Sequence, residues 1–332
     1  MRFVALLAVP LAVLTGTSVM ALVGRLGRRR LAAAGVLAAI GVLLLPGVTF
    51  VLAKPPALES RRAVERALAW LRRATPDAGD PWDRTASPAW AVLAPWPYGH
   101  EVLVVGGRAN VASPLISPGD TEGLEDALRF ALTSRPSDGE ELLARHDVRY
   151  VLTTAPSLPT LQRYATVLGL DAGRLATPEG GPTPELLAAS AVALHQRAGS
   201  ATDGESWGFL RLLHDVDGKI RIFERVPGAR VTLERLPPGT EAAVRVDLDV
   251  AGTPLTWVAR GRAGAAGALG IRVPYATQGS PAPGNVTVRG AAVSVAGRVL
   301  PLSVPESAVQ AGERIGPGTV PDPAALSGVP QS

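Results

Sequence analysis

Cysteine is absent from the 332-residue chain, and lysine is nearly absent. The lack of cysteine excludes disulfide bonds as a source of stability. Because Lys54 and Lys219 are the two lysines, arginine supplies almost all of the positive charge, and the 33 basic residues exceed the 29 acidic ones by only four. Four arginines within residues 25–30 account for this excess. The remainder of the chain is close to neutral, which predicts no binding of nucleic acid.

Residues with the usual catalytic and metal-binding chemistry are also sparse. The chain has four histidines, and His100, His146 and His195 stand apart in the sequence without the pattern of a catalytic triad. Three aspartates at positions 77, 80 and 83 recur at a spacing of three, but without the glycine and terminal glutamate of an EF-hand loop. We therefore predict no catalytic residue and no metal site in this chain.

Long apolar runs are present only at the start of the chain. Residues 3–23 and 31–53 are each about twenty residues long, enough at about 1.5 Å per residue to cross a hydrocarbon core of about 30 Å. We predict a transmembrane hairpin over residues 1–54, with a cleaved signal peptide as the alternative for the first run. The arginines between the runs are expected on the cytoplasmic side. The predicted localisation is a two-span protein of the cell membrane, in contact with the lipid bilayer, with everything after Lys54 extracytoplasmic.

Residues 55–228 mix helical and strand patterns. Helices are predicted at residues 57–75, 121–132, 140–146, 158–169, 184–196 and 207–214. Strands are predicted at residues 89–93, 101–105, 148–153 and 220–225. This alternation predicts a mixed α/β core domain.

From residue 229 the hydrophobic pattern has a period of two, with short strands between glycine and proline turns. We predict a β domain over residues 229–312, either a sandwich or a barrel. Residues 313–332 are rich in proline, glycine and serine and are predicted to be disordered. The predicted fold class is α+β: a transmembrane helical hairpin, a mixed α/β core domain, and a small β-sandwich or barrel.

A short aromatic motif is the most informative part of the sequence. Residues 96–100 read Trp-Pro-Tyr-Gly-His, and residues 101–110 continue as Glu-Val-Leu-Val-Val-Gly-Gly-Arg-Ala-Asn. This stretch resembles the WWDYG motif that begins the soluble domain of oligosaccharyltransferase catalytic subunits. A second match, Trp-Leu-Arg-Arg-Ala-Thr-Pro at residues 70–76, precedes it at a compatible distance. Further matches in the same order extend the resemblance, of the archaeal type, from about Pro55 to Gly312.

The resemblance implies which residues bind the acceptor peptide. The motif residues Trp96, Tyr98, Gly99 and His100 correspond to the peptide-binding turn of that family. Two departures matter, because Pro95 replaces the first tryptophan and Pro97 replaces the aspartate. Proline has no side-chain acceptor for a ligand hydroxyl. Trp96 and Tyr98 are thus expected either to line a peptide groove or to plug the membrane-facing end of the domain.

The resemblance also implies a function that this chain does not complete by itself. In the family, a lipid-linked glycan is transferred to an asparagine by a site whose Mn²⁺ or Mg²⁺ is held by acidic loops between earlier spans. The expectation is an acceptor-binding, C-terminal part of an oligosaccharyltransferase-like protein that contains no cofactor. A polytopic membrane partner would supply the metal site, and acceptor peptide and lipid-linked glycan would be its ligands. The alternative is a non-catalytic, membrane-anchored extracytoplasmic domain that binds a peptide, a glycan or a protein.

One sequon occurs in the predicted β domain. Asn285-Val286-Thr287 lies in an expected exposed turn. An asparagine in this pattern is an acceptor for N-glycosylation in an extracytoplasmic protein. Asn285 is therefore a predicted glycosylation site.

Overall fold

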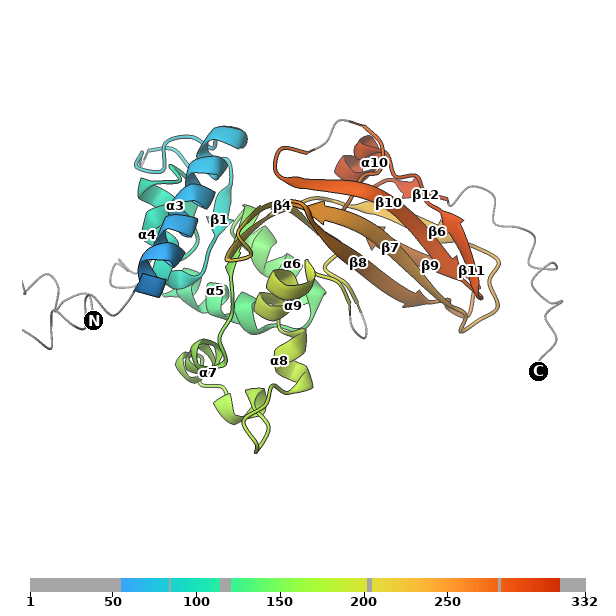
Figure 1. The fold of residues 1–332 in the computed structure, drawn as a ribbon, viewed down its shortest axis with the longest axis horizontal. Coiled ribbons are helices and arrows are strands. Elements are labelled where there is room, and N and C mark those ends of the chain that lie inside the picture. Colours follow the sequence, from blue (N-terminus) through green and yellow to red (C-terminus); the bar gives the residue numbers. More distant parts are fainter. Residues whose placement is uncertain (1–54, 84, 114–120, 202–204, 280–281, 317–332) are drawn as a thin grey trace, which may run out of the picture. The chain divides into compact units, whose positions relative to one another are not determined.

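The computed structural model of the chain describes residues 55–83, 85–113, 121–201, 205–279 and 282–316. The described residues from Arg61 onward belong to one compact unit. The first helix of the described part is α3 (Pro55–Ala74). Figure 1 gives the order of the elements.

A mixed five-stranded sheet forms the centre of the first half of this unit. Its strands are β1 (Ala91–Leu93), β2 (Ala109–Asn110), β3 (Val148–Thr154), β4 (Leu210–Val216) and β5 (Ile220–Arg225). They lie in the order β2-β1-β3-β5-β4. Strand β1 is parallel to both β2 and β3, whereas β5 is antiparallel to β3 and β4. The carboxyl ends of β1 and β3 therefore meet at one edge of the sheet.

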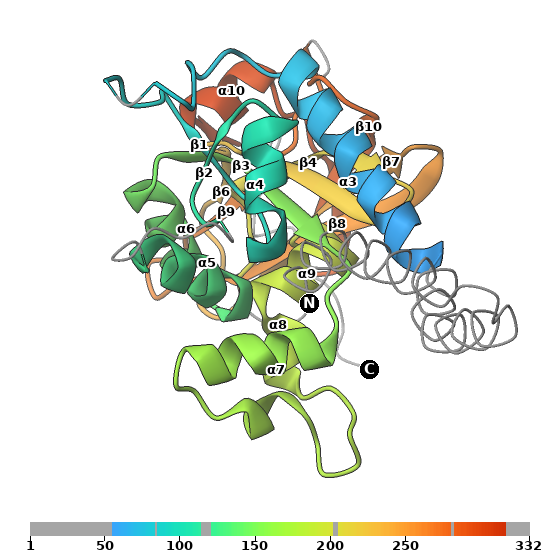
Figure 2. The same cartoon turned by 90° about the vertical axis from the view of Figure 1, so that its left-hand side faces the viewer.

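Helices cover both faces of this sheet. On one face, α3 and α4 (Gly99–Val104) share a hydrophobic cluster with Tyr150 and Leu152 of β3. On the other face, α5 (Glu122–Leu132), α6 (Pro136–Arg145) and α9 (Ser190–Arg197) pack against Val151 and Phe223. Figure 2 shows α3 and α4 on their side of the sheet. The predicted mixed α/β core is confirmed.

A smaller group of helices follows β3. It consists of α7 (Leu158–Val167), the 3-10 helix η2 (Ala172–Leu175) and α8 (Pro184–Ala188), which share a hydrophobic cluster of their own. Ser157 begins α7, where its side chain accepts a hydrogen bond from the backbone N–H of Thr160. Serine is favoured at this position because it satisfies an N–H that has no partner within the helix.

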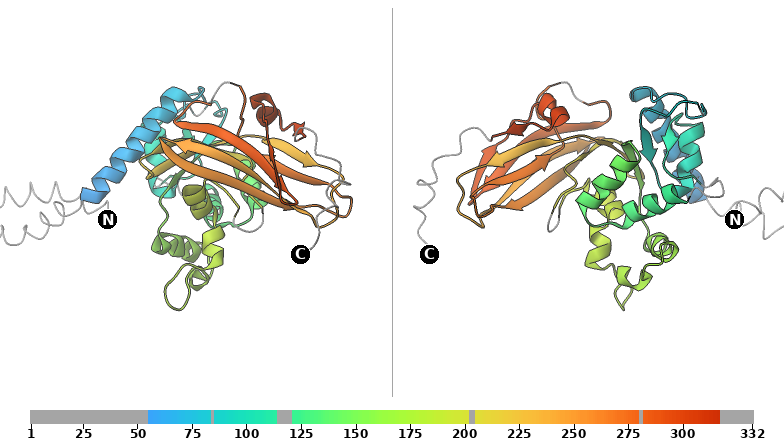
Figure 3. Two further views of the ribbon diagram at one scale, coloured as in Figure 1. Left: turned by 45° about the vertical axis from the view of Figure 1, so that its right-hand side comes forward. Right: turned by 180° about the vertical axis from the view of Figure 1, so that it is seen from behind.

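Strands dominate the remainder of the described residues. One sheet contains β7 (Glu241–Val250), β8 (Thr253–Arg262), β10 (Val286–Val295) and β11 (Arg298–Pro301), in the order β11-β10-β7-β8. A second contains β6 (Ala229–Leu233), β9 (Leu269–Val273) and β12 (Arg314–Ile315), in the order β12-β6-β9. Helix α10 (Glu306–Ala311) lies beside β6 (Figure 3). Because Val246 of β7 and Ile271 of β9 share one core, the two sheets pack as a sandwich.

The predicted transmembrane hairpin and the two-span localisation require correction. Among the helices of the described residues, none is both long enough and apolar enough to cross a bilayer. The hairpin was assigned to residues 1–54, which lie outside the described residues. The α+β fold class with a transmembrane hairpin is thus replaced by a mixed α/β architecture with strand-rich sheets.

Two elements differ in type from the prediction. Residues 101–105 were expected to form a strand, but Glu101–Val104 belong to α4, where Val102 packs against the cluster under α3. Residues 207–214 were expected to form a helix, but from Leu210 they form β4. Short apolar runs do not distinguish a buried helix from a buried strand, and tertiary pairing decides between them.

The pairing that makes β4 a strand begins at a tight turn. Asp217 and Gly218 both have positive φ angles, 56° and 65°, and the N–H of Lys219 donates to the carbonyl of Val216. These are the features of a type I′ hairpin turn, for which an Asp-Gly pair is the common sequence.

Candidate functional site

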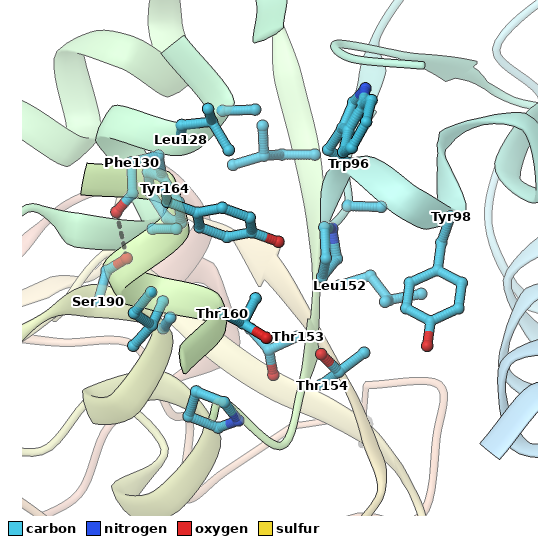
Figure 4. A pocket seen from close by; sticks show the side chains of 18 of the residues that line it. Trp96, Tyr98, Leu128, Phe130, Leu152, Thr153, Thr154, Thr160, Tyr164 and Ser190 are labelled. Carbon is cyan, nitrogen blue, oxygen red and sulfur yellow. Dashed lines mark hydrogen bonds between the residues drawn. The ribbon is translucent and has the colours of Figure 1, made fainter. Parts of the chain in front are cut away.

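A cavity of about 260 Å³ opens at the carboxyl edge of β1 and β3. Its wall on one side is the turn that follows β1, and on the other side it is α5 and α7. Figure 4 shows Trp96 across the cavity from Phe130 and Tyr164. In sheets with parallel strands, ligands bind outside the carboxyl ends of the strands. The position of this cavity follows that rule.

The aromatic motif supplies one wall of the cavity. Trp96 and Tyr98 belong to the 3-10 helix η1 (Trp96–Tyr98), and both line the cavity. The indole N–H of Trp96 donates to the carbonyl of Ser113 at 3.1 Å, which holds the ring in place. The ring is therefore presented to the cavity chiefly as an apolar surface.

Helix α7 supplies part of the opposite wall through Thr160, Leu161 and Tyr164. The hydroxyls of Ser157 and Thr160 lie 2.7 Å apart at the start of the helix. Burial raises the pKa of Tyr164, and the nearby phenol of Tyr98 raises it further. Tyr164 thus remains a neutral phenol at physiological pH. The fold thus brings the motif turn and α7 together at one cavity.

No described residue that lines the cavity carries a charge. Pro95 and Pro97, which replace the family's tryptophan and aspartate, both lie in the wall. The polar groups of the lining are hydroxyls from threonine, serine and tyrosine. An ionised ligand group would enter without a counter-charge, at a considerable cost in desolvation. The cavity is therefore suited to an uncharged group.

Gly99 and His100 do not line the cavity. Gly99 begins α4, and a Cβ atom there would collide with the carbonyl of Ala112 and the side chain of Asn110. This glycine therefore permits the close approach of the chain's own segment around Asn110. His100 is partly exposed, with its Nδ1 3.7 Å from Glu101.

Asn285 lies away from the cavity, at the edge of β4. Its Oδ1 accepts from the backbone N–H of Asp215 at 2.9 Å, and its Nδ2 donates to the Asp215 carbonyl at 2.8 Å. A glycan on Nδ2 would have to coexist with this bond or replace it. N-glycosylation at Asn285 stays a prediction.

The sequence prediction missed several residues of the cavity. Thr153 at the end of β3 and Ser190 at the start of α9 both line it, and Thr153 is joined to His195. The sequence did contain an indication for Thr153, because polar residues at the end of a buried parallel strand lie at the carboxyl edge of the sheet, where ligands bind. It contained no such indication for Ser190 or for His195, because only the packing of α9 brings Ser190 to the cavity and His195 to Thr153.

Comparison with known proteins identifies one family domain in the chain. Residues 228–315 match the family described as archaeal glycosylation protein B long peripheral domain. No curated protein matches the chain.

Solved structures of Archaeoglobus fulgidus oligosaccharyltransferase have a similar fold. The complex with zinc and sulfate matches with a TM-score of 0.63 and 17% identity over 76% of this chain, which spans 46% of that protein's length. The protein tethered to an acceptor peptide with an NVT sequon matches with a TM-score of 0.64 and 16% identity, again over 76% of this chain and 43% of that one.

Within the described part of the chain, no three histidine, aspartate or glutamate side chains come together as a metal site requires. Residues 228–315 match the archaeal glycosylation protein B long peripheral domain, and 76% of the chain has a fold similar to part of an archaeal oligosaccharyltransferase.

Proposed function

We propose that this chain is the acceptor-binding part of an oligosaccharyltransferase-like system, and that its cavity receives an uncharged side chain of the acceptor peptide. The observation that supports this most strongly is the position of Trp96 and Tyr98 opposite α7 at the carboxyl edge of β1 and β3. An aromatic wall and a set of hydroxyls suit a small side chain that has both an apolar part and a hydrogen-bond donor.

The size of the cavity argues for a peptide side chain over a glycan. Pockets for drug-sized ligands have volumes of about 300–1,000 Å³. The cavity has about 260 Å³ and is predominantly apolar in its lining, with Phe130, Leu128 and Val151 among its walls. An oligosaccharide is larger and needs many polar partners, whereas one or two peptide side chains fit these dimensions.

Transfer of a glycan requires components beyond this cavity. We propose that the Mn²⁺ or Mg²⁺ ion and the site for the lipid-linked glycan belong to a polytopic partner, and that this chain provides recognition. The residues of the cavity then hold and orient the peptide, with no proton transfer or metal coordination assigned to them.

A second candidate is a peptide-binding domain that takes part in no glycan transfer. It is favoured by Pro97, which stands in the cavity wall where the family has an aspartate. The two candidates differ in whether binding to this chain raises the rate of transfer by a partner.

Binding can be measured by calorimetry with the purified full chain and a peptide that contains Asn-Val-Thr. Trp96→Ala should weaken binding about tenfold or more, because removing a buried aromatic anchor usually costs at least 1–2 kcal/mol. Trp82→Ala is the matched control, since Trp82 is 63% exposed and does not line the cavity. This control should bind as the wild type does.

Equal affinity of wild type and Trp96→Ala, or no binding by the wild type, would contradict the proposal. If binding is established, the chain is added to a purified polytopic partner with Mn²⁺, and glycan transfer is assayed. A rate increase that Trp96→Ala abolishes supports the transferase role. An unchanged rate supports the second candidate, a peptide-binding domain that takes part in no glycan transfer.

A further inference from the structure

The sequon Asn285-Val286-Thr287 is attached to the edge strand β4 through its asparagine. Oδ1 of Asn285 accepts from the N–H of Asp215 at 2.9 Å, and Nδ2 donates to the carbonyl of the same residue at 2.8 Å. The backbone N–H of Asn285 donates to the carbonyl of Leu213 at 3.2 Å. We name these three hydrogen bonds the β4 clamp. They give partners to backbone groups at the open edge of the five-stranded sheet.

The remaining backbone of the sequon is also hydrogen-bonded within the chain. Strand β10 begins beside β4 (Figure 1), and residues 286–287 at its start pair with residues 249–250 of β7. The carbonyl of Asn285 accepts from the N–H of Ala251 at 2.9 Å. An enzyme that approaches the folded chain therefore meets an asparagine whose amide and backbone are already engaged.

Gly284 permits the close approach of the sequon to β4. Its φ angle is 140°, and a Cβ atom there would lie 1.9 Å from the carbonyl oxygen of Leu213. A larger residue at this position would therefore move the segment away from β4. Gly290, within β10, has no atom within 4 Å of an added Cβ. The two glycines thus provide a substitution that opens the clamp and one that leaves it closed, both with the sequon intact.

The clamp uses one particular hydrogen of the side-chain amide. Both side-chain bonds go to Asp215, whose N–H and C=O project from the same edge of β4. A planar amide engages such a pair with its oxygen and with the Nδ2 hydrogen on the same side of the C–N bond. N-glycosylation makes a secondary amide, which prefers the trans form, and this form places the sugar where that hydrogen was. The glycan therefore replaces the hydrogen that is donated to Asp215.

We infer that Asn285 is a glycosylation acceptor only while the β4 clamp is open, so that the glycan and the clamp exclude each other. The glycan is attached before residues 284–287 dock on β4. The donor is a lipid-linked glycan. Its anomeric carbon forms a bond to Nδ2, its bond to the lipid phosphate breaks with the electron pair going to the phosphate, and the Nδ2 proton is lost to solvent. This site lies away from the cavity, so the inference does not depend on the proposed function.

The first experiment compares two times of exposure to an oligosaccharyltransferase and its lipid-linked glycan. The enzyme is present in membranes during cell-free synthesis of the full chain, or it is added to the purified, folded chain. Mass spectrometry should show Asn285 modified at least tenfold more during synthesis, because closed hydrogen bonds keep the open form rare. Equal modification in the two cases overturns the inference, as does an unmodified Asn285 in both.

Thr287→Val is the control for the site of modification. It removes the sequon hydroxyl, which belongs to an exposed side chain, and leaves the clamp residues unchanged. Modification during synthesis should disappear in this variant. If it persists, the glycan is not on this sequon and the inference fails.

The second experiment opens the clamp in the folded chain. Gly284→Ala should be modified at least tenfold faster than the wild type when the enzyme is added after folding, whereas Gly290→Ala should match the wild type. Circular dichroism checks that both variants are folded. Equal rates for Gly284→Ala and the wild type would show that the clamp is not the barrier.

Hydrogen exchange of the glycosylated wild-type chain needs no variant. The N–H of Asp215 loses its acceptor when the glycan is present and should exchange at least tenfold faster than in the unmodified chain, while the amides of the central strand β3 keep their protection. Equal protection of Asp215 in the two forms would mean that the glycan and the clamp coexist, and the inference would be wrong.

Discussion

His195 is a residue whose properties come from its surroundings. Isolated in the sequence, it lies in the fold between the hydroxyl of Thr153 and the carbonyl of Gly218. Burial, the largest cause, lowers its pKa from 6.5 to about 4. The sequence could show that the chain has few histidines. It could not show that this one joins β3 to the β4–β5 turn, because the partners are 42 and 23 residues away.

The lowered pKa predicts how stability depends on pH. Above pH 6.5 the imidazole is neutral in both the folded and the unfolded chain, and its contribution is fully present. As the pH falls from 6.5 towards 4, the unfolded chain takes up a proton that the folded chain does not, and stability is lost. We expect His195 to contribute a loss of about 3 kcal/mol over this interval.

Urea denaturation at pH 7.5, 6 and 5 measures this effect. His195→Gln keeps one acceptor and one donor but does not titrate, so its free energy of unfolding should fall less steeply with pH than that of the wild type. His214, whose pKa is also lowered, chiefly by burial, is present in both proteins and cancels in the difference. Parallel pH curves for the two proteins would refute the assignment.

At the scale of single elements, the Gly-Gly-Arg end of the motif stabilises α3. The Nη2 of Arg108 donates to the carbonyls of Arg72, Thr75 and Pro76 at 3.1–3.3 Å. Its guanidinium also lies 5.3 Å from the centroid of the Trp90 ring. Carbonyls at the end of a helix have no partner within the helix, and a cation there is favourable.

Arg108→Lys should destabilise the chain by about 2 kcal/mol. The ammonium group of lysine retains the charge, but it lacks the planar fork that serves several carbonyls together and stacks on an aromatic ring. Arg73→Lys provides the control, because Arg73 is exposed on the same helix. Chemical denaturation should show a lower free energy of unfolding for Arg108→Lys but not for Arg73→Lys. Equal stability of these two variants would exclude a role of Arg108 in capping α3.

At the scale of the whole compact unit, a buried ion network connects the five-stranded sheet with α10. Arg211 of β4 lies 2.7 Å from Glu224 of β5 and 2.7 Å from Glu306 of α10. Arg211 and Glu224 are each 5% exposed. Removal of one partner from such a pair leaves a buried charge without compensation.

Arg211→Met should therefore cost about 3 kcal/mol in the free energy of unfolding, and adding Glu224→Gln should recover part of this loss. The matched control is Arg262→Met, which removes an exposed ion pair with Glu241 and should change stability by about 0–1 kcal/mol. Urea denaturation of the wild type and the three variants checks this. A double variant no more stable than Arg211→Met would show that Glu224 is not the group left uncompensated.

The sequence by itself determined the features that depend on neighbouring residues. Apolar periodicity was sufficient to locate α5, β3 and the period-two strands of the sandwich, and the motif at residues 96–110 indicated the resemblance to oligosaccharyltransferases. The substitution of Pro97 for an aspartate was likewise visible directly.

The tertiary structure decided everything that depends on distant contacts. It made residues 99–104 a helix under α3 and residues 210–216 a strand beside β5, since packing selects between two conformations that a short apolar run allows equally. By placing α9 against β3, it also brought Ser190 to the cavity beside Thr153, and His195 to the hydroxyl of Thr153. Local sequence sets the preference of each segment, but burial and pairing with distant segments supply the larger free energy and so determine the site.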